Sequence, residues 1–175
     1  MLKAESAEVV VAGGQESMSN APYLLLKGRS GYRYGHSTVY DHMALDGLED
    51  AYQRGQAMGI FAEQMVEEYQ FTREDQDNYA IESLNRALKA IEDGSFEWEI
   101  TPVTISSRRG DVVVDTDEQP GNAKPDRIPS LRPAFKKDGT VTAANASSIS
   151  DGAAALVMMR ASTADKLGVK PLARV

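Results

Sequence analysis

The sequence of 175 residues contains no cysteine and only two histidines. The missing thiols exclude disulfide bonds, thiolate metal sites and a cysteine nucleophile within these residues. A chain without cysteine suits a reducing compartment, so we expect a cytoplasmic protein. No run of about 18 apolar residues is present, and the sequence therefore predicts no membrane-spanning helix. The first residues, Met1 to Glu5, lack the basic and apolar pattern of a secretory signal peptide.

Positive charge is in the minority, because 19 Lys and Arg face 26 Asp and Glu to give a net charge of −7. A general nucleic-acid binder needs clustered cations for the phosphates, so we expect no nucleic-acid partner. Apolar residues make up 42% and charged residues 26%, which is the mix of a globular protein. A chain of this length is enough for one ordinary domain, and hardly for two.

Two fully apolar runs lie near opposite ends of the sequence, at Val9–Ala12 and Ala153–Met159. Such runs are typical of strands buried on both faces of a sheet. Gly13 and Gly14 are expected to end the first strand, and Leu2–Glu8 reads as the end of a helix. If the two strands pair, the residues between them form an insertion between neighbouring strands of one sheet. The sequence therefore predicts an α/β fold.

The inserted region has clear helix signals. Apolar residues at helical spacing predict a helix over 58–69, with Glu63 lying off the apolar stripe. Thr72 is a natural N-cap for a second helix that ends before Gly94. Three further elements are expected: short helices over 43–52 and 162–167, and a hairpin with strands 99–105 and 111–115. Residues 116–137 read as a proline-rich loop.

Several familiar kinds of site fit the sequence poorly. His36 and His42 lack the spacing of a metal motif, and we expect no metal. Ser17 follows a strand, but the G-x-S-x-G motif of a nucleophile elbow is missing. Gly13-Gly14 alone does not make a nucleotide-binding loop.

Two segments keep both a structural and a functional interpretation. A basic stretch with interleaved apolar residues suits either a charged phosphate with an apolar ring or a solvated face. The small residues of 140–155 suit either close approach to a ligand or tight packing at the start of the second strand. The cations of the basic stretch are Lys124, Arg127, Arg132, Lys136 and Lys137.

Motifs along the whole sequence resemble those of the thiolase family. They are Val9–Ser19, the Met-Gly-x-x-Ala-Glu-like segment 58–63, the Thr-Arg-x-x-Gln-Asp segment 72–77, Leu131–Phe135, and 138–155 with Asn145-Ala146-Ser147. The resemblance implies part of the thiolase fold, with two adjacent buried strands bracketing a large and mostly helical loop domain. The expected divisions are 1–19 and 151–175 for the N-terminal thiolase half and 20–150 for the loop domain.

The resemblance also implies a ligand and a site. In this family the loop domain holds coenzyme A, whose thioester is a substrate rather than a cofactor. Met58 is expected to line the acyl or pantetheine pocket, while Leu131 and Phe135 flank the coenzyme. Ser147 is expected to bond the pantetheine amide, with Ala143 close by. The polar loop Lys27–His42 resembles a region used for tetramer contacts, and we expect a homo-oligomer, either a dimer or a tetramer.

Family members are acyltransferases that cleave or form 3-ketoacyl-CoA with a cysteine nucleophile, a histidine and a second cysteine. None of these is recognisable here, and they are expected before Met1 and beyond Val175, so we expect this chain alone to be inactive. Three positions depart from the family pattern: Ala57 where His is frequent, Gly121 where Arg is common, and Ala144 where Gly is usual. The alternative is a non-catalytic coenzyme A-binding or assembly module acting with a separate catalytic chain.

Overall fold

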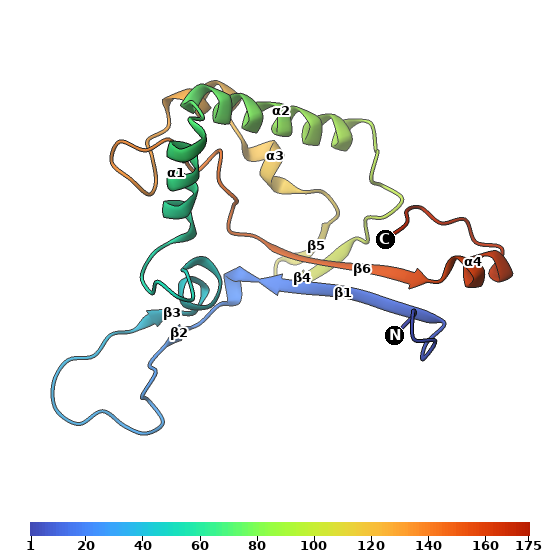
Figure 1. The fold of residues 1–175 in the computed structure, drawn as a ribbon, viewed down its shortest axis with the longest axis horizontal. Coiled ribbons are helices and arrows are strands. Elements are labelled where there is room, and N and C mark those ends of the chain that lie inside the picture. Colours follow the sequence, from blue (N-terminus) through green and yellow to red (C-terminus); the bar gives the residue numbers. More distant parts are fainter. The chain divides into compact units, whose positions relative to one another are not determined.

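The computed structural model describes all 175 residues, which form two compact units. The first unit comprises Met1–Leu45 with Ile149–Val175, and the second comprises Asp46–Ser148. Figure 1 shows their elements in chain order. These are β1 Val9–Ser17, η1 Met18–Asn20, β2 Tyr23–Leu24, β3 Tyr40–Asp41, η2 Ala44–Leu48, α1 Met58–Tyr69, α2 Arg73–Glu92, β4 Val103–Ser107, β5 Gly110–Val114, α3 Glu118–Asn122, η3 Pro125–Ser130, β6 Asp151–Met159 and α4 Ala161–Leu167.

The two apolar runs pair as predicted. β1 and β6 form an antiparallel ribbon whose register runs from Val9 opposite Met159 to Ser17 opposite Asp151 (Figure 1). The expectation that Gly13 and Gly14 end the strand is wrong, because both lie inside β1. A Cβ atom on Gly13 would lie 2.3 Å from the carbonyl oxygen of Ala154, so glycine serves a close approach between strands rather than a turn.

The prediction that these strands are buried on both faces is not met in this structure. Val9 and Val11 on β1, and Leu156 and Val157 on β6, are exposed. A ribbon of two strands leaves both faces open, however apolar its residues are.

Polar contacts hold the ends of the ribbon. At one end, the N–H of Ser19 donates to Asp151 Oδ1 over 3.0 Å, and the Ser19 hydroxyl donates to Asp151 Oδ2. These bonds lower the pKa of Asp151, the hydroxyl contributing most. At the other end, Arg160 Nη1 lies 2.8 Å from Glu5 Oε1. Residues 2–6 form turns with a positive φ at Glu5, so the expected helix end over 2–8 is wrong.

The helices of the second unit follow local sequence signals. α1 begins at Met58 and ends at Tyr69, as predicted, and α2 begins after Thr72. The Thr72 hydroxyl accepts from the N–H of Asp75, and the Asp75 carboxylate accepts from the N–H of Thr72. This capping box satisfies two backbone donors that the first turn leaves open. No helix in the structure is long and apolar enough to cross a membrane.

The remaining elements differ from prediction in their bounds. The β4–β5 hairpin forms, but residues 99 and 100 instead donate backbone hydrogen bonds to Phe96 in a turn. η2 stops at Leu48, because Glu49 forms a bridge with Ala57. The loop predicted over 116–137 contains α3 and η3, whose start signals are an Asp117 cap and Pro125 in the first turn.

Candidate functional site

The candidate site is the segment 128–147, which is tied to α1 and α2 of the same unit. Three side chains from the helices make these ties: Glu63 on α1, and Arg73 and Asp77 on α2. Glu63 lies off the apolar stripe of α1, yet only 4% of its surface is exposed.

The Glu63 carboxylate holds the chain at Thr140 and Val141. It accepts from the N–H of Val141 at 2.8 Å and from the N–H of Thr140 at 3.0 Å. The Thr140 hydroxyl adds a bond of 3.3 Å. A Cβ atom on Gly139 would lie 2.3 Å from Glu63 Oε1, so a side chain at Gly139 would displace the carboxylate. A buried carboxylate is tolerated here because donors surround it.

Arg73 fixes the beginning of the segment. Its Nη2 donates to the carbonyl oxygens of Ile128 and Leu131 at 3.0 and 3.1 Å. Its Nε lies 2.7 Å from Oδ2 of Asp77, one helical turn further along α2. Ile128 is one of the few buried apolar residues, so the same contact region also holds part of the unit's core.

Asn145 joins the end of the segment to the same network. Its Nδ2 donates to Asp77 Oδ1 at 3.2 Å and to the carbonyl of Thr140 at 3.1 Å. Its Oδ1 accepts from the N–H of Thr142 at 2.7 Å, and Thr142 is completely buried. Gln76 on α2 donates to the Thr140 hydroxyl at 3.0 Å. The run of small residues therefore begins in a fixed conformation, as close approach to a ligand or neighbour requires.

The structure places the five expected binding residues on or beside this framework. The ring of Phe135 lies against Gly59, where a Cβ atom would come within 2.3 Å of Cδ2, and Met58 precedes that glycine at the start of α1. The carbonyl of Leu131 accepts from Arg73. Ala143 and Ser147 are exposed on the small-residue run. None of the five lines the cavities of about 610 Å³ and 370 Å³ in the second unit.

The basic stretch, residues 124–137, overlaps the beginning of this segment. Lys136 pairs with Glu67 on α1, and the hydrogen bond to Glu67 raises the pKa of Lys136. The other four cations are exposed and form no ion pair. They are Lys124, Arg127, Arg132 and Lys137. Unpaired cations beside an exposed aromatic ring suit a ligand that carries both phosphates and an apolar part.

No group of three or more His, Asp or Glu side chains is arranged to hold a metal ion. Ser17 at the end of β1 accepts a 2.8 Å hydrogen bond from the Asn20 amide at its Oγ, which stabilises a turn.

Sequence reasoning missed the residues that build the framework, although their motifs were noticed. Arg73, Gln76 and Asp77 belong to the 72–77 motif, and Asn145 stands in its own short motif. The only sequence feature that could have drawn attention to Glu63 is that this carboxylate lies next to the apolar stripe of its helix. Its neighbour Gly139 is far away in the sequence. Nothing in helical spacing links those two positions.

Comparison with known proteins identifies the family. Residues 1–162 match the family described as "Thiolase, N-terminal domain". The chain is 48% identical over 176 residues to "Acetyl-CoA acetyltransferase" of Pseudomonas aeruginosa, covering 99% of this chain and 44% of that protein. It is 50% identical over 171 residues to "Acetyl-CoA acetyltransferase 2" of Arabidopsis thaliana, covering 96% of this chain and 42% of the relative. The chain thus spans less than half the length of these relatives.

Solved structures agree with the sequence comparison. The acetyl-CoA acetyltransferase of Syntrophomonas wolfei superposes with a TM-score of 0.85 at 44% identity, over 97% of this chain and 42% of that one. The acetyl-CoA acetyltransferase of Bacillus anthracis gives a TM-score of 0.87 at 43% identity, over 98% and 43%. The expected α/β class and thiolase fold are confirmed by these likenesses. The chain belongs to the thiolase family.

Proposed function

We propose that this chain is the coenzyme A-binding part of an acyl-CoA C-acyltransferase. The reaction is the reversible thiolytic cleavage, or Claisen condensation, of a 3-ketoacyl-CoA such as acetoacetyl-CoA. The observation that carries the proposal is the 48% identity, over 99% of the chain, to a protein named acetyl-CoA acetyltransferase. A role in fatty acid metabolism, a cytoplasmic location and a homotetrameric assembly are part of the same proposal.

In this proposal, the framework built on Glu63 and Asp77 holds the binding segment in its binding-competent conformation before the ligand binds. Phe135 lies against Gly59, the neighbour of Met58 in the first turn of α1, and we propose that Phe135 and Met58 offer the apolar surface for the pantetheine or acyl part. Ser147 bonds the pantetheine amide with Ala143 close by, while Leu131 and Phe135 flank the coenzyme. Preorganisation of this kind lowers the entropy lost on binding.

The phosphates would be bound by the four exposed cations of the basic stretch. Each unpaired guanidinium or ammonium group can donate charge-assisted hydrogen bonds to phosphate oxygens. Gly121 stands where related sequences commonly have Arg, so one phosphate contact is removed and we expect weaker binding. Ala57 and Ala144 alter the pocket and the adjoining backbone more mildly.

The chemistry requires a thiol that these 175 residues do not contain. We propose that the nucleophilic cysteine, the activating histidine and the second cysteine belong to another part of the enzyme. The competing proposal is a non-catalytic coenzyme A-binding or assembly module that acts with a separate catalytic chain. Its support is the same absence of cysteine, and both proposals require coenzyme A binding.

Titration calorimetry with coenzyme A tests the binding part. We expect measurable affinity that falls on Phe135→Ala and Ser147→Ala, while the exposed Lys170→Ala outside the second unit leaves it unchanged. Unchanged affinity in both site variants would refute the assigned site. An assay of acetoacetyl-CoA thiolysis then separates the roles. The pure chain should be inactive, and a cysteine-bearing chain that co-purifies and restores activity would favour the assembly module.

A further inference from the structure

One face of the β4–β5 hairpin of the second unit carries four branched apolar residues, with Ser107 and Gly110 on the same face at its tip. In its register Val103 lies opposite Val114, and Ile105 opposite Val112. Since side chains alternate across a strand and opposite residues share a face, these four side chains point to the same side. Thr104, Ser106 and Asp111 lie on the other side, together with Val113.

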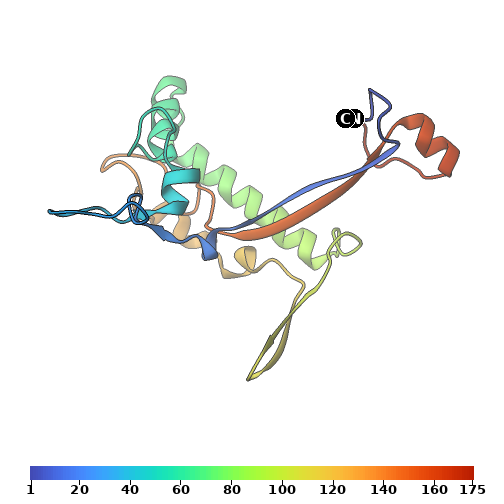
Figure 2. The ribbon, with the colours of Figure 1, turned by 90° about the horizontal axis from the view of Figure 1, so that it is seen from below.

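This apolar face has no cover. All ten residues of the two strands are exposed, with Ile105 at 55% and Val112 at 60%. Figure 2 shows the hairpin extending away from α2 and α3. A two-stranded hairpin is marginally stable alone in water, and an apolar face of this kind gains stability when a second layer packs on it.

The tip of the hairpin is its cationic end. Arg108 and Arg109 occupy the turn, and neither forms an ion pair. The turn itself is well fixed: the Ser107 hydroxyl donates to the Gly110 carbonyl at 2.9 Å and accepts from the N–H of Arg109 at 3.2 Å. Gly110 has a φ of +115°, a conformation that glycine readily adopts.

The base of the hairpin is its acidic end. A cavity of about 610 Å³ adjoins it, and Pro102 and Asp115, which flank the two strands, line this cavity. Its apolar part includes Ile91, Phe96 and Ile100. Its carboxylates come from Glu97, Glu99, Asp115 and Asp117.

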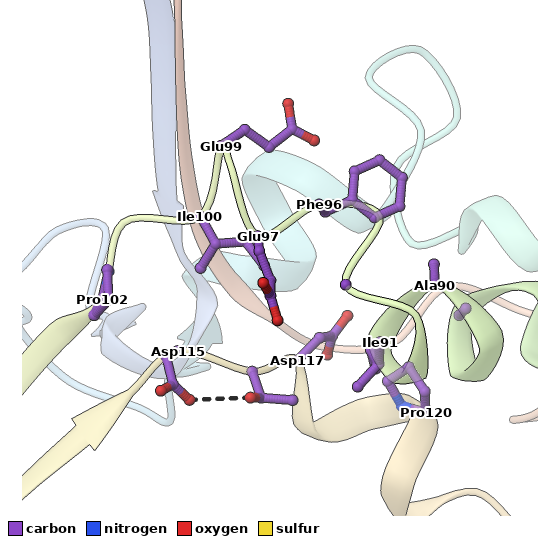
Figure 3. Close-up of a pocket in the computed structure, with 13 residues that line it drawn as sticks. Ala90, Ile91, Phe96, Glu97, Glu99, Ile100, Pro102, Asp115, Asp117 and Pro120 are labelled. Carbon is purple, nitrogen blue, oxygen red and sulfur yellow. Dashed lines mark hydrogen bonds between the residues drawn. The ribbon is translucent and has the colours of Figure 1, made fainter.

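These carboxylates lack a cation. None of the four forms an ion pair, and Figure 3 shows Glu97 and Asp117 turned toward the same part of the cavity. Asp115 accepts only the hydroxyl of the neighbouring Thr116, at 3.0 Å. The carboxylates are not grouped to hold a metal ion. A guanidinium group with an apolar stem fits a cavity that is lined by both apolar side chains and carboxylates.

We propose that the apolar hairpin face docks a second copy of this chain in antiparallel orientation. A two-fold axis that lies between the two faces, perpendicular to the strands, reverses the strand direction, which brings the tip of each hairpin to the base of the other. Val103, Ile105, Val112 and Val114 then pack on their counterparts, and the arginines of each tip enter the acidic cavity of the partner copy. Such a contact is self-complementary, as a two-fold interface requires.

Both halves of the contact are matched in length and charge. In each copy, tip and base are separated by a strand of five residues. When the two faces overlap fully in antiparallel orientation, the tip of each hairpin therefore lies at the base of the other. Opposite charges meet at both ends, whereas a parallel arrangement would place two arginine pairs together and two acidic cavities together. Like charges would oppose that arrangement.

Disulfide trapping tests the orientation directly, because the natural chain has no cysteine to interfere. Two single variants, Arg108→Cys and Glu97→Cys, are purified, mixed in equal amounts and oxidised mildly. We expect the mixed disulfide to exceed the statistical share of one half, since position 108 of one copy faces position 97 of the other. A statistical product ratio, an excess of 108–108 links, or no cross-linking would overturn the proposal.

Charge exchange provides a second, reversible readout by sedimentation equilibrium. Arg108→Glu with Arg109→Glu should weaken self-association by about tenfold or more, and adding Glu97→Lys and Glu99→Lys should restore most of it. The matched control, Lys170→Glu with Arg174→Glu, makes the same change in net charge on exposed residues of the first unit. If Arg108→Glu with Arg109→Glu left self-association unchanged, or if the control weakened it equally, the proposed contact would be contradicted. These measurements do not involve coenzyme A, so their outcome is independent of the proposed coenzyme A binding and acyl transfer.

Discussion

The Glu63 carboxylate accepts a 2.8 Å hydrogen bond from the N–H of Val141, although the two residues are 78 positions apart. Val141 is itself buried, as is Glu63, so water does not replace this contact when it is lost. The bond therefore couples the middle of α1 to the segment on which the proposed binding residues lie. Its energy sets how firmly that segment is held.

Replacing Glu63 with Ala should lower the free energy of unfolding by about 2 kcal/mol, because buried N–H donors lose their acceptor. Glu63→Gln should cost less, since the amide oxygen still accepts one of the bonds. Urea unfolding followed by circular dichroism measures both. Glu68→Gln on the exposed side of α1 is the control, and we expect little change there. If Glu63→Ala and Glu63→Gln lowered the free energy of unfolding equally, the stabilising effect of Glu63 would not come from accepting hydrogen bonds.

Gly59→Ala should disturb the contact between α1 and Phe135. The added Cβ atom would lie 2.3 to 2.4 Å from three ring carbons, so the ring must move. Overpacking of this kind costs about 1–3 kcal/mol of stability, and the displaced ring should also weaken coenzyme A binding. Gly121→Ala is the control, since no atom lies within 4 Å of its new Cβ. Thermal unfolding and calorimetry measure the two effects, and wild-type behaviour of Gly59→Ala would contradict the packing.

Local signals in the sequence predicted the parts of the fold whose stabilising contacts are local. α2 could be placed because Thr72 and Asp75 satisfy each other within one turn. The pairing of β1 and β6 followed from two apolar runs, a pattern that survives a separation of more than a hundred residues. The exposure of Val11 and Leu156 could not be predicted, because residue type indicates what a strand can bury and not what covers it.

The candidate site was predicted by resemblance, and its framework was not predicted at all. Phe135 and Ser147 came from motif matches, while the roles of Glu63 and Asn145 depend on partners distant in sequence. The spacing of residues along a helix does not distinguish a carboxylate that is buried from one that is exposed. Only the fold brings the N–H groups of residues 140 and 141 to Glu63, and the amide of Asn145 to Asp77.

The ion pair between Arg73 and Asp77 should carry a large coupling energy. Asp77 is only 3% exposed and also accepts from Asn145, so Asp77→Ala should cost about 3 kcal/mol by leaving Arg73 and Asn145 without a partner. Arg73→Met should be costly too, but the double variant should cost clearly less than the sum. The exposed pair Arg86 and Glu82 has the same helical spacing and is the control. Its coupling should stay below about 0.5 kcal/mol. Additive effects at Arg73 and Asp77 would refute the network.

The capping box of α2 should make stability depend on pH in the acid range. The hydroxyl of Thr72, and then its N–H, lower the pKa of Asp75 in the folded chain. The ionised carboxylate therefore stabilises the fold above about pH 4, the ordinary value for Asp, and this contribution is lost as pH falls through the lower folded pKa. The difference in unfolding free energy between the natural chain and Asp75→Asn should thus be constant near neutral pH and shrink below pH 4. Thr72→Val removes the hydroxyl, which has the larger effect, and should abolish most of this dependence. Parallel pH profiles for the natural chain and Asp75→Asn would show that the cap does not depend on the charge of Asp75.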